Sequence, residues 1–237
     1  MNPNSAAPAR LTLPLARAGL VQTLLVLGLL ALLTAGCGKE KLAPLPRDAL
    51  LLVVGDSISA GFGIDPAQAW PQLLAQRSGW RVVNGGVNGD LSADALSRLP
   101  GLLEQHAPQL VLLEIGGNDM LRGVADARIR GNIEQMVAAA KGRGAQVVLM
   151  AVPRPSLMGA ALSALKPADF YLAIADGMSI PLLEDALSDV LSSQDFKLDP
   201  LHPNAAGHEA LARKVGAELR ALGLLEEEAS PRGPPQR

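Results

Sequence analysis

Residues 49–57 read ALLLVVGDS. An unbroken apolar run over residues 49–54 stops at Gly55, Asp56 and Ser57. Strands that are buried on both faces, as in parallel sheets, have continuous apolar runs rather than alternating ones. We therefore predict a central strand here, with Ser57 in the loop at its carboxyl end.

The same pattern returns along the chain, separated by helical periodicities. Further strands are predicted at residues 81–84, 109–115, 146–151 and, more weakly, 180–183. Between them, two groups of side chains recur at the spacing of one helix face: Leu96, Leu99, Leu103 and His106, and Ile129, Ile133, Met136 and Ala140. Alternating strands and helices imply parallel strands with helices on both faces. The predicted fold class is α/β, a three-layer α/β/α sandwich, in which ligands bind beside the carboxyl ends of the strands.

Helix boundaries are indicated at two further places. Pro71 suits the first turn of a helix that begins near Trp70. Asn204 suits the cap of the last helix. The buried face of that helix is predicted to be Leu211, Val215, Leu219 and Leu222. His208 lies inside the same predicted helix and is interpreted as a surface residue.

Composition excludes one class of partner. The 21 Lys and Arg residues are scattered against 23 Asp and Glu residues, and the formal net charge is -2. A nucleic-acid partner would require a basic stretch or a strongly positive domain, so no nucleic-acid binding is expected. Aromatic residues make up only 3% of the chain, so the core must consist of aliphatic side chains, which suits helices packed on a sheet.

The N-terminus has the features of an export signal. Arg10 and Arg17 precede an uncharged, Leu- and Val-rich run over residues 18–38, which contains the sequence LTAGC ending at Cys37, the single cysteine. This resembles a bacterial lipoprotein signal, with Cys37 as the lipidation site. The alternative is an uncleaved helix, since about 20 apolar residues can cross a bilayer. Both alternatives place the rest of the chain outside the cytoplasm.

These features divide the chain into four parts. Residues 1–36 are predicted to be the signal peptide and residues 37–47, with two prolines and several charges, a tether. Residues 48–225 form the predicted folded domain, and residues 226–237, rich in Glu and Pro, a disordered tail. The expected location is the bacterial cell envelope, facing the periplasm, with a lipid anchor in the membrane.

The loop after the first strand holds a candidate nucleophile. Ser57 lies between small residues directly after a buried strand, although a serine there could simply cap the next helix. The motif is not the Gly-x-Ser-x-Gly of α/β-hydrolases, because Ser59 occupies the position of the second glycine.

Three later loops supply complementary groups. The second strand is followed by Gly-rich residues 85–90, whose backbone N–H groups can approach a ligand. After the third strand, Asn118 can offer a side-chain amide to a developing oxyanion. Near the C-terminus, Asp199 precedes His202 by three residues, a spacing that lets the acid orient one imidazole nitrogen while the other faces a nucleophile.

A metal site is the competing interpretation of these residues. Asp199, His202 and His208 are all possible ligands, but no further His or Cys cluster completes a coordination sphere, so we predict no metal and no cofactor.

Together these motifs resemble the GDSL/SGNH hydrolases. GDSI at residues 55–58, Gly89, GGND at residues 116–119 and DPLH at residues 199–202 match four of the family's blocks. The match extends over nearly all of residues 49–222. Trp70-Pro71, Val83-Asn84 and Leu121-Arg122-Gly123 resemble the bacterial branch that contains the multifunctional thioesterase, arylesterase and lysophospholipase enzymes. The resemblance implies a flavodoxin-like parallel sheet.

The resemblance also implies a serine hydrolase mechanism. Ser57, Asp199 and His202 would be the catalytic triad, and the oxyanion hole would consist of the backbone N–H groups of Ser57 and Gly89 and the side chain of Asn118. Asp56 and Asp119 are interpreted as residues that shape their loops. The substrate would be a small ester or a lipid.

Substrate alternatives remain open from the sequence. Residues 153–165, with Pro155, Leu157, Met158, Ala160, Ala161 and Leu162, could line an acyl channel or form a packed lid. The same triad could serve a carbohydrate O-acetyl esterase acting on envelope polysaccharide. A non-catalytic lipoprotein that binds acyl chains is the third alternative.

Overall fold

A parallel sheet lies at the centre of the domain. The computed structural model describes residues 44–156, 158–159 and 163–226. Among these residues, five strands pair in the order β2-β1-β3-β4-β5, and all four pairings are parallel. The strands are β1 (Leu50–Gly55), β2 (Arg81–Gly86), β3 (Leu110–Glu114), β4 (Gln146–Met150) and β5 (Leu182–Leu183). This is the flavodoxin-like order, so the predicted fold class is confirmed.

Two strands differ from their predicted lengths. β2 continues to Gly86, because Gly85 and Gly86 pair in register with the end of β1. The bare glycine is needed there, since a Cβ on Gly86 would lie 2.4 Å from the backbone nitrogen of Ala60. The weak strand predicted at residues 180–183 shrinks to two residues at the edge of the sheet.

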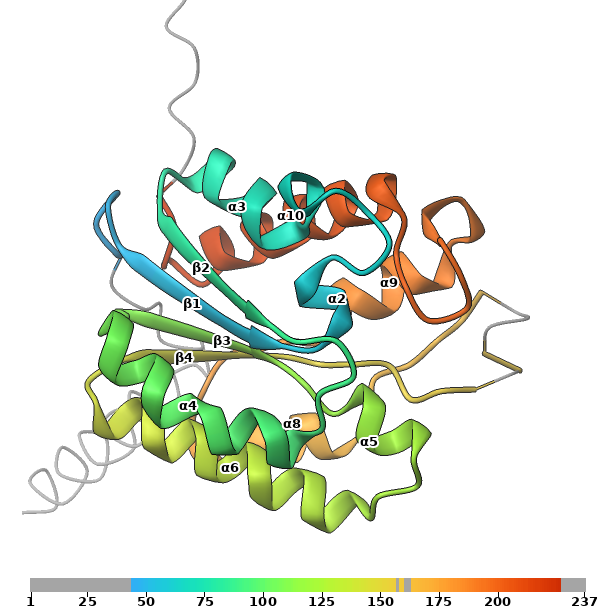
Figure 1. The fold of residues 1–237 in the computed structure, drawn as a ribbon, viewed down its shortest axis with the longest axis horizontal. Helices are drawn as coiled ribbons and strands as arrows, with labels where there is room; N and C mark the ends of the chain where they lie inside the picture. Colours follow the sequence, from blue (N-terminus) through green and yellow to red (C-terminus); the bar gives the residue numbers. More distant parts are fainter. Residues whose placement is uncertain (1–43, 157, 160–162, 227–237) are drawn as a thin grey trace, which may run out of the picture. The chain divides into compact units, whose positions relative to one another are not determined.

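Helices cover both faces of the sheet (Figure 1). One layer contains α3 (Trp70–Ser78), α9 (Ala186–Ser192) and α10 (Ala205–Ala221). The other contains α4 (Ser92–His106), α6 (Asp126–Gly142) and α8 (Phe170–Met178). Two short helices, α2 (Ser57–Ala60) and α5 (Gly117–Leu121), follow the carboxyl ends of β1 and β3. Two 3-10 turns, Pro66–Gln68 and Gln194–Phe196, complete the described elements.

The predicted helix signals are found in place. Pro71 lies in the first turn of α3, and the Asn204 side chain caps α10 by accepting a hydrogen bond from the Gly207 N–H at 2.9 Å. The predicted inner faces of α6 and α10 are buried, although Leu222 is only partly so. On α4, Ala95, Leu99 and Leu103 are buried, whereas Leu96 and His106 are only half-buried.

The prediction that His208 lies on the surface is wrong. Its side chain is completely buried, and its Nδ1 accepts a hydrogen bond from the Trp70 N–H of α3 at 3.2 Å. Position 208 lies three and seven residues before Leu211 and Val215, so it continues the apolar stripe of α10. Burial lowers the pKa of His208 from 6.5 to about 4, so this ring is neutral at ordinary pH.

The described chain ends lie against the domain. The Leu45 N–H, in the last part of the predicted tether, donates to the Leu224 carbonyl at 2.9 Å. The predicted signal peptide, Cys37 and the predicted tail beyond Glu226 lie outside the described residues. Among the residues that the structure describes, no helix is long and apolar enough to cross a membrane.

Candidate active site

Ser57 lies where β1 ends and α2 begins. It is the first residue of α2, while the preceding Asp56 caps the helix by accepting a hydrogen bond from the Ile58 N–H at 3.0 Å. Ser57 therefore does not act as the cap, which was the alternative left by the sequence. Gly55 allows the sharp exit from the strand, since a Cβ there would lie 2.3 Å from the Ser59 hydroxyl oxygen.

The loop before α10 brings an acid and a histidine to this serine. The Ser57 Oγ and the His202 Nε2 are 3.0 Å apart. The other ring nitrogen, Nδ1, is 2.8 Å from Asp199 Oδ2. Asp199 Oδ1 also accepts the backbone N–H groups of Leu201 and His202, both at 2.8 Å. Serine, histidine and acid thus form one continuous chain of hydrogen bonds, as the three-residue spacing predicted.

The electrostatics of the acid suit this arrangement. Partial burial alone would raise the pKa of Asp199, but the hydrogen bonds from His202 and from the two backbone N–H groups outweigh it and hold the pKa below 3.8. The His202 side chain is 17% exposed and that of Asp199 is 37% exposed. The imidazole is therefore accessible to solvent, while the hydrogen bond between Nδ1 and Asp199 fixes its orientation.

An aromatic ring also touches the histidine. Phe62, just after α2, lies with its ring centroid 4.6 Å from that of His202, at an interplanar angle of 36°. Sequence reasoning missed this residue. Its place five positions after Ser57 offered no chemical signal, because the contact depends on how the loop folds back over the site.

Asn118 reaches the same edge from α5. Its Nδ2 donates to the Asp90 carbonyl at 3.1 Å and lies 3.3 Å from Asp56 Oδ2. Gly89 precedes Asp90 in the turn after β2 and has a φ of +80°, which favours glycine. Asn118 lines the cavity described below, whereas Gly89 is in the adjacent turn and is not one of the lining residues.

Buried acidic residues lie next to the segment that carries Ser57. Glu114, the last residue of β3, is fully buried, and its Oε2 accepts the Ser59 hydroxyl at 2.7 Å. Burial raises the pKa of Glu114 well above 4.5, and burial also raises that of Asp56 to about 6. On the α4 side, Asp119 accepts the backbone N–H and hydroxyl of Ser92 at 2.8 and 2.6 Å. Asp56 and Asp119 thus hold their loops in place, in agreement with their interpretation as loop-shaping residues.

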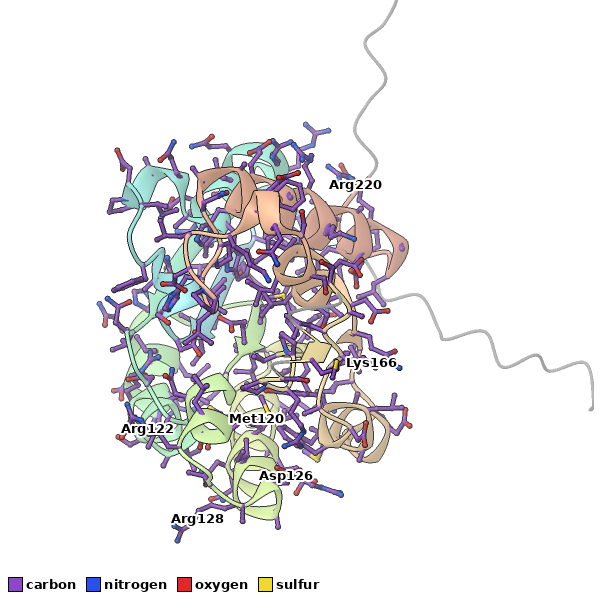
Figure 2. All side chains as sticks on the ribbon, turned by 90° about the vertical axis from the view of Figure 1, so that its right-hand side faces the viewer. Met120, Arg122, Asp126, Arg128, Lys166 and Arg220 are labelled. Atoms are coloured by element: carbon purple, nitrogen blue, oxygen red, sulfur yellow. The ribbon has the colours of Figure 1, made fainter. Side chains whose placement is uncertain are left out.

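A cavity of about 340 Å³ opens beside Ser57 and His202. Its wall is mainly apolar and includes Ile58, Leu121, Val152, Pro153, Pro155, Leu165, Leu191 and Leu201. Arg154 also lines it and forms a salt bridge with Asp126 of α6 at 2.5 Å. Figure 2 looks onto this carboxyl edge of the sheet, with Asp126 and Arg128 of α6 in its lower half and Arg220 of α10 in its upper half.

The predicted channel segment meets this cavity in part. Pro153, Pro155 and Leu165 line it, whereas Met158 is 69% exposed and faces a separate hollow. Leu157, Ala160, Ala161 and Leu162 lie outside the described residues. Among the described residues, no group of three or more His, Cys, Asp or Glu side chains is placed to hold a metal ion.

Known proteins resemble this chain over most of its length. Esterase TesA of Pseudomonas aeruginosa is 38% identical over 202 residues, which cover 81% of this chain and 98% of the relative. Thioesterase 1/protease 1/lysophospholipase L1 of Escherichia coli is 35% identical over 175 residues, which cover 73% of this chain and 84% of the relative. A crystal structure of TesA aligns with a TM-score of 0.66 at 38% identity, over 73% of this chain and 99% of that one.

A family-level match spans the site itself. Residues 53–210 match the GDSL-like Lipase/Acylhydrolase family. This range contains Ser57, Asn118, Asp199 and His202, the side chains that meet at the carboxyl edge of the sheet. With a family match over more than half of its length, a parallel sheet in the predicted order and relatives above 30% identity, the chain belongs to the GDSL-like lipase/acylhydrolase family.

Proposed function

We propose that this protein is a serine esterase that hydrolyses carboxylic esters or thioesters through an acyl-serine intermediate. The observation that carries the proposal is the hydrogen-bonded series from Ser57 Oγ through His202 to Asp199, with distances of 3.0 and 2.8 Å. Ser57 and His202 line an apolar cavity that is large enough for an acyl chain.

The proposed reaction has two steps. His202 Nε2 takes the proton of Ser57 while Oγ attacks the carbonyl carbon, and the imidazolium then gives that proton to the departing alcohol or thiol. In the second step His202 removes a proton from water, whose oxygen attacks the acyl carbon. The bond from this carbon to Ser57 Oγ then breaks, and the imidazolium returns the proton to Oγ, which releases the acid and the free serine. Asp199 accepts a hydrogen bond from the Nδ1–H group throughout, which keeps the proton on Nδ1 and leaves Nε2 available as the base.

The negative charge that develops on the carbonyl oxygen requires donors. We assign this role to the backbone N–H groups of Ser57 and Gly89 and to Asn118 Nδ2. The contact of Asn118 with the Asp90 carbonyl engages one amide hydrogen and thereby fixes the direction of the amide. The second hydrogen lies toward Asp56, which also lines the cavity, and we assign this hydrogen to the oxyanion. Loss of one such donor typically costs about 100-fold to 1000-fold in turnover.

The apolar wall favours an acyl chain over an acetylated sugar. Relatives named esterase, thioesterase and lysophospholipase support acyl esters as the substrate class. The test is hydrolysis of p-nitrophenyl acetate and octanoate by residues 38–237, with Ser57→Ala beside it. We expect turnover that Ser57→Ala abolishes and a higher kcat/KM for the longer ester. Turnover of acetate alone would select the carbohydrate O-acetyl esterase, and no turnover at all would select the acyl-binding protein.

We also propose that the enzyme is exported and anchored in the cell envelope. The support is the apolar segment of residues 18–38 that follows Arg17 and contains Cys37. Cleavage before Cys37 would leave a lipidated Cys37, the tether at residues 37–47, the domain at residues 48–225 and the tail at residues 226–237. Metabolic labelling with an alkyne fatty acid is expected to mark the wild type and not Cys37→Ser. Equal labelling of both would overturn lipidation at this cysteine, and unlabelled full-length protein in membranes would indicate the uncleaved helix.

A further inference from the structure

Arg98 of α4 connects two loops of the site. Its side chain is only 24% exposed. Its Nε donates to Asp90 Oδ2 at 2.7 Å, and a terminal nitrogen, Nη2, donates to the Gly55 carbonyl at 3.1 Å. One planar guanidinium therefore joins the end of β1, two residues before Ser57, to the turn that follows β2.

The third loop is attached through the backbone of Asp90. The carbonyl of this residue accepts the Asn118 amide at 3.1 Å, and its carboxylate, 11% exposed, is the group that Arg98 holds. Asp90 also directly follows Gly89. The loops that carry Ser57, Gly89 and Asn118 are thus connected through Arg98 and Asp90, although Arg98 does not line the cavity.

From this geometry we propose that Arg98 is the positioning residue of the oxyanion hole. The inference rests on the proposed function, because it assigns Arg98 to the donors of that reaction. Arg98 acts through Asp90: if Asp90 moves, the carbonyl that aims the Asn118 amide moves with it, and so does the adjacent Gly89 N–H. A lysine cannot replace it, since an ammonium group lacks the rigid fork that holds two acceptors at fixed angles.

A positioning role and a merely structural role have different consequences. Displaced donors weaken binding of the tetrahedral transition state more than binding of the planar substrate. The expected signature is therefore a lower kcat with a nearly unchanged KM. A structural role would lower the melting temperature and leave the kcat of the folded enzyme as it was.

The experiment compares Arg98→Lys with wild type, Ser57→Ala and the control Arg130→Lys. Arg130 pairs with Glu134 on the outer face of α6 and provides the same substitution in an ion pair outside the site. The assays are kcat and KM on a p-nitrophenyl ester and inhibition by an alkyl boronic acid, which forms a tetrahedral adduct with a serine.

For Arg98→Lys we expect a kcat lower by about 10- to 100-fold, less than the loss of a whole donor. Boronic acid affinity is expected to fall by a similar factor and KM to change by less than about 3-fold, with Arg130→Lys like wild type. If Arg98→Lys does not fold, Asp90→Asn decides, with a kcat decrease of about 3- to 10-fold expected from its weaker neutral bond to Arg98.

A folded Arg98→Lys variant with the kcat of wild type would overturn the inference. A lower kcat combined with wild-type affinity for the boronic acid would overturn it as well. If Arg98→Lys does not fold, a wild-type kcat in Asp90→Asn would overturn it. A failure of the proposed function has another result: wild type would not turn over the ester, or would do so no faster than Ser57→Ala.

Discussion

Two histidines six residues apart occupy opposite environments. His202, in the loop before α10, is held by Asp199 and faces the Ser57 hydroxyl, with its side chain 17% exposed. His208, in the second turn of α10, is fully buried and accepts a hydrogen bond from the Trp70 N–H. The partner of Nδ1 therefore determines the role of each ring. A carboxylate at Nδ1 accepts the Nδ1–H group and leaves Nε2 free to act as a base, whereas an N–H donor at Nδ1 requires that this nitrogen carry no proton.

The largest effect expected from this comparison is on turnover. His202→Ala should lower kcat by about 10⁴-fold or more, because Ser57 loses its base. His208→Gln should leave kcat within about 3-fold, because its Oε1 can still accept the Trp70 N–H. Steady-state hydrolysis of a p-nitrophenyl ester measures both. Comparable decreases of kcat in the two variants would show that the two histidines do not differ in their roles.

The next effect tests the acid behind His202. Asp199→Asn keeps the shape of the side chain but removes the charge and favours the wrong tautomer of the imidazole, so kcat should fall by about 100-fold to 10⁴-fold. The fold of Asp199→Asn should be preserved, which a melting temperature close to that of wild type would show. A kcat within 5-fold of wild type would show that His202 does not depend on Asp199.

The third effect concerns stability and pH. The folded-state pKa of His208 is about 4, below its usual 6.5, so between these values the unfolded chain binds a proton that the folded chain does not. The free energy of unfolding therefore falls as pH decreases from 6.5 to 4, by about 3 kcal/mol from this ring. Urea unfolding at pH 7 and pH 4.5 should show a smaller decrease for His208→Gln than for wild type.

His106→Gln is the matched control for that measurement, since His106 is a half-buried histidine on α4. This substitution removes a histidine from another helix and leaves the contact between His208 and Trp70 in place. Because burial raises the pKa of Asp56 to about 6, this acid has the opposite sign, stabilising the fold as pH falls from 6 toward 3.8. The difference in pH dependence between wild type and His208→Gln isolates the contribution of His208. An identical decrease in the free energy of unfolding in all three proteins would contradict the assignment of this contribution to His208.

The smallest effect concerns the ring beside His202. Phe62→Leu removes an aromatic contact at 4.6 Å while keeping an apolar side chain. Contacts of this kind are worth about 0.5–1.5 kcal/mol, so kcat/KM should fall by about 2- to 10-fold. Ester hydrolysis across pH 5–9 measures it. An unchanged dependence of kcat/KM on pH would show that Phe62 does not help to orient His202.

The sequence predicts the sheet and the site better than the long-range packing. The apolar runs located β1, β3 and β4 to within one residue at each end, because a strand buried on both faces must be apolar throughout. The loops after these strands then had to share one edge of the sheet, which brought Ser57 and Asn118 together. Local spacing also joined Asp199 to His202.

Contacts between distant helices were not predictable in this way. His208 follows the periodicity of Leu211, a signal that could have indicated burial, but its partner Trp70 is 138 residues away. Arg98 and Glu114 gave no motif either. Their roles depend on which carbonyl or hydroxyl the folded chain brings within reach, and a pattern of apolar residues does not encode that.

We predict that His202 activates Ser57, and covalent labelling tests this role. A fluorophosphonate is applied to wild type, Ser57→Ala, His202→Ala and His208→Gln, and the labelled peptide is identified by mass spectrometry. We expect one adduct on Ser57, formed at similar rates in wild type and in His208→Gln. We expect no adduct in Ser57→Ala and labelling slowed by at least about 100-fold in His202→Ala. Labelling of another residue, or equal rates in His202→Ala and wild type, would contradict it.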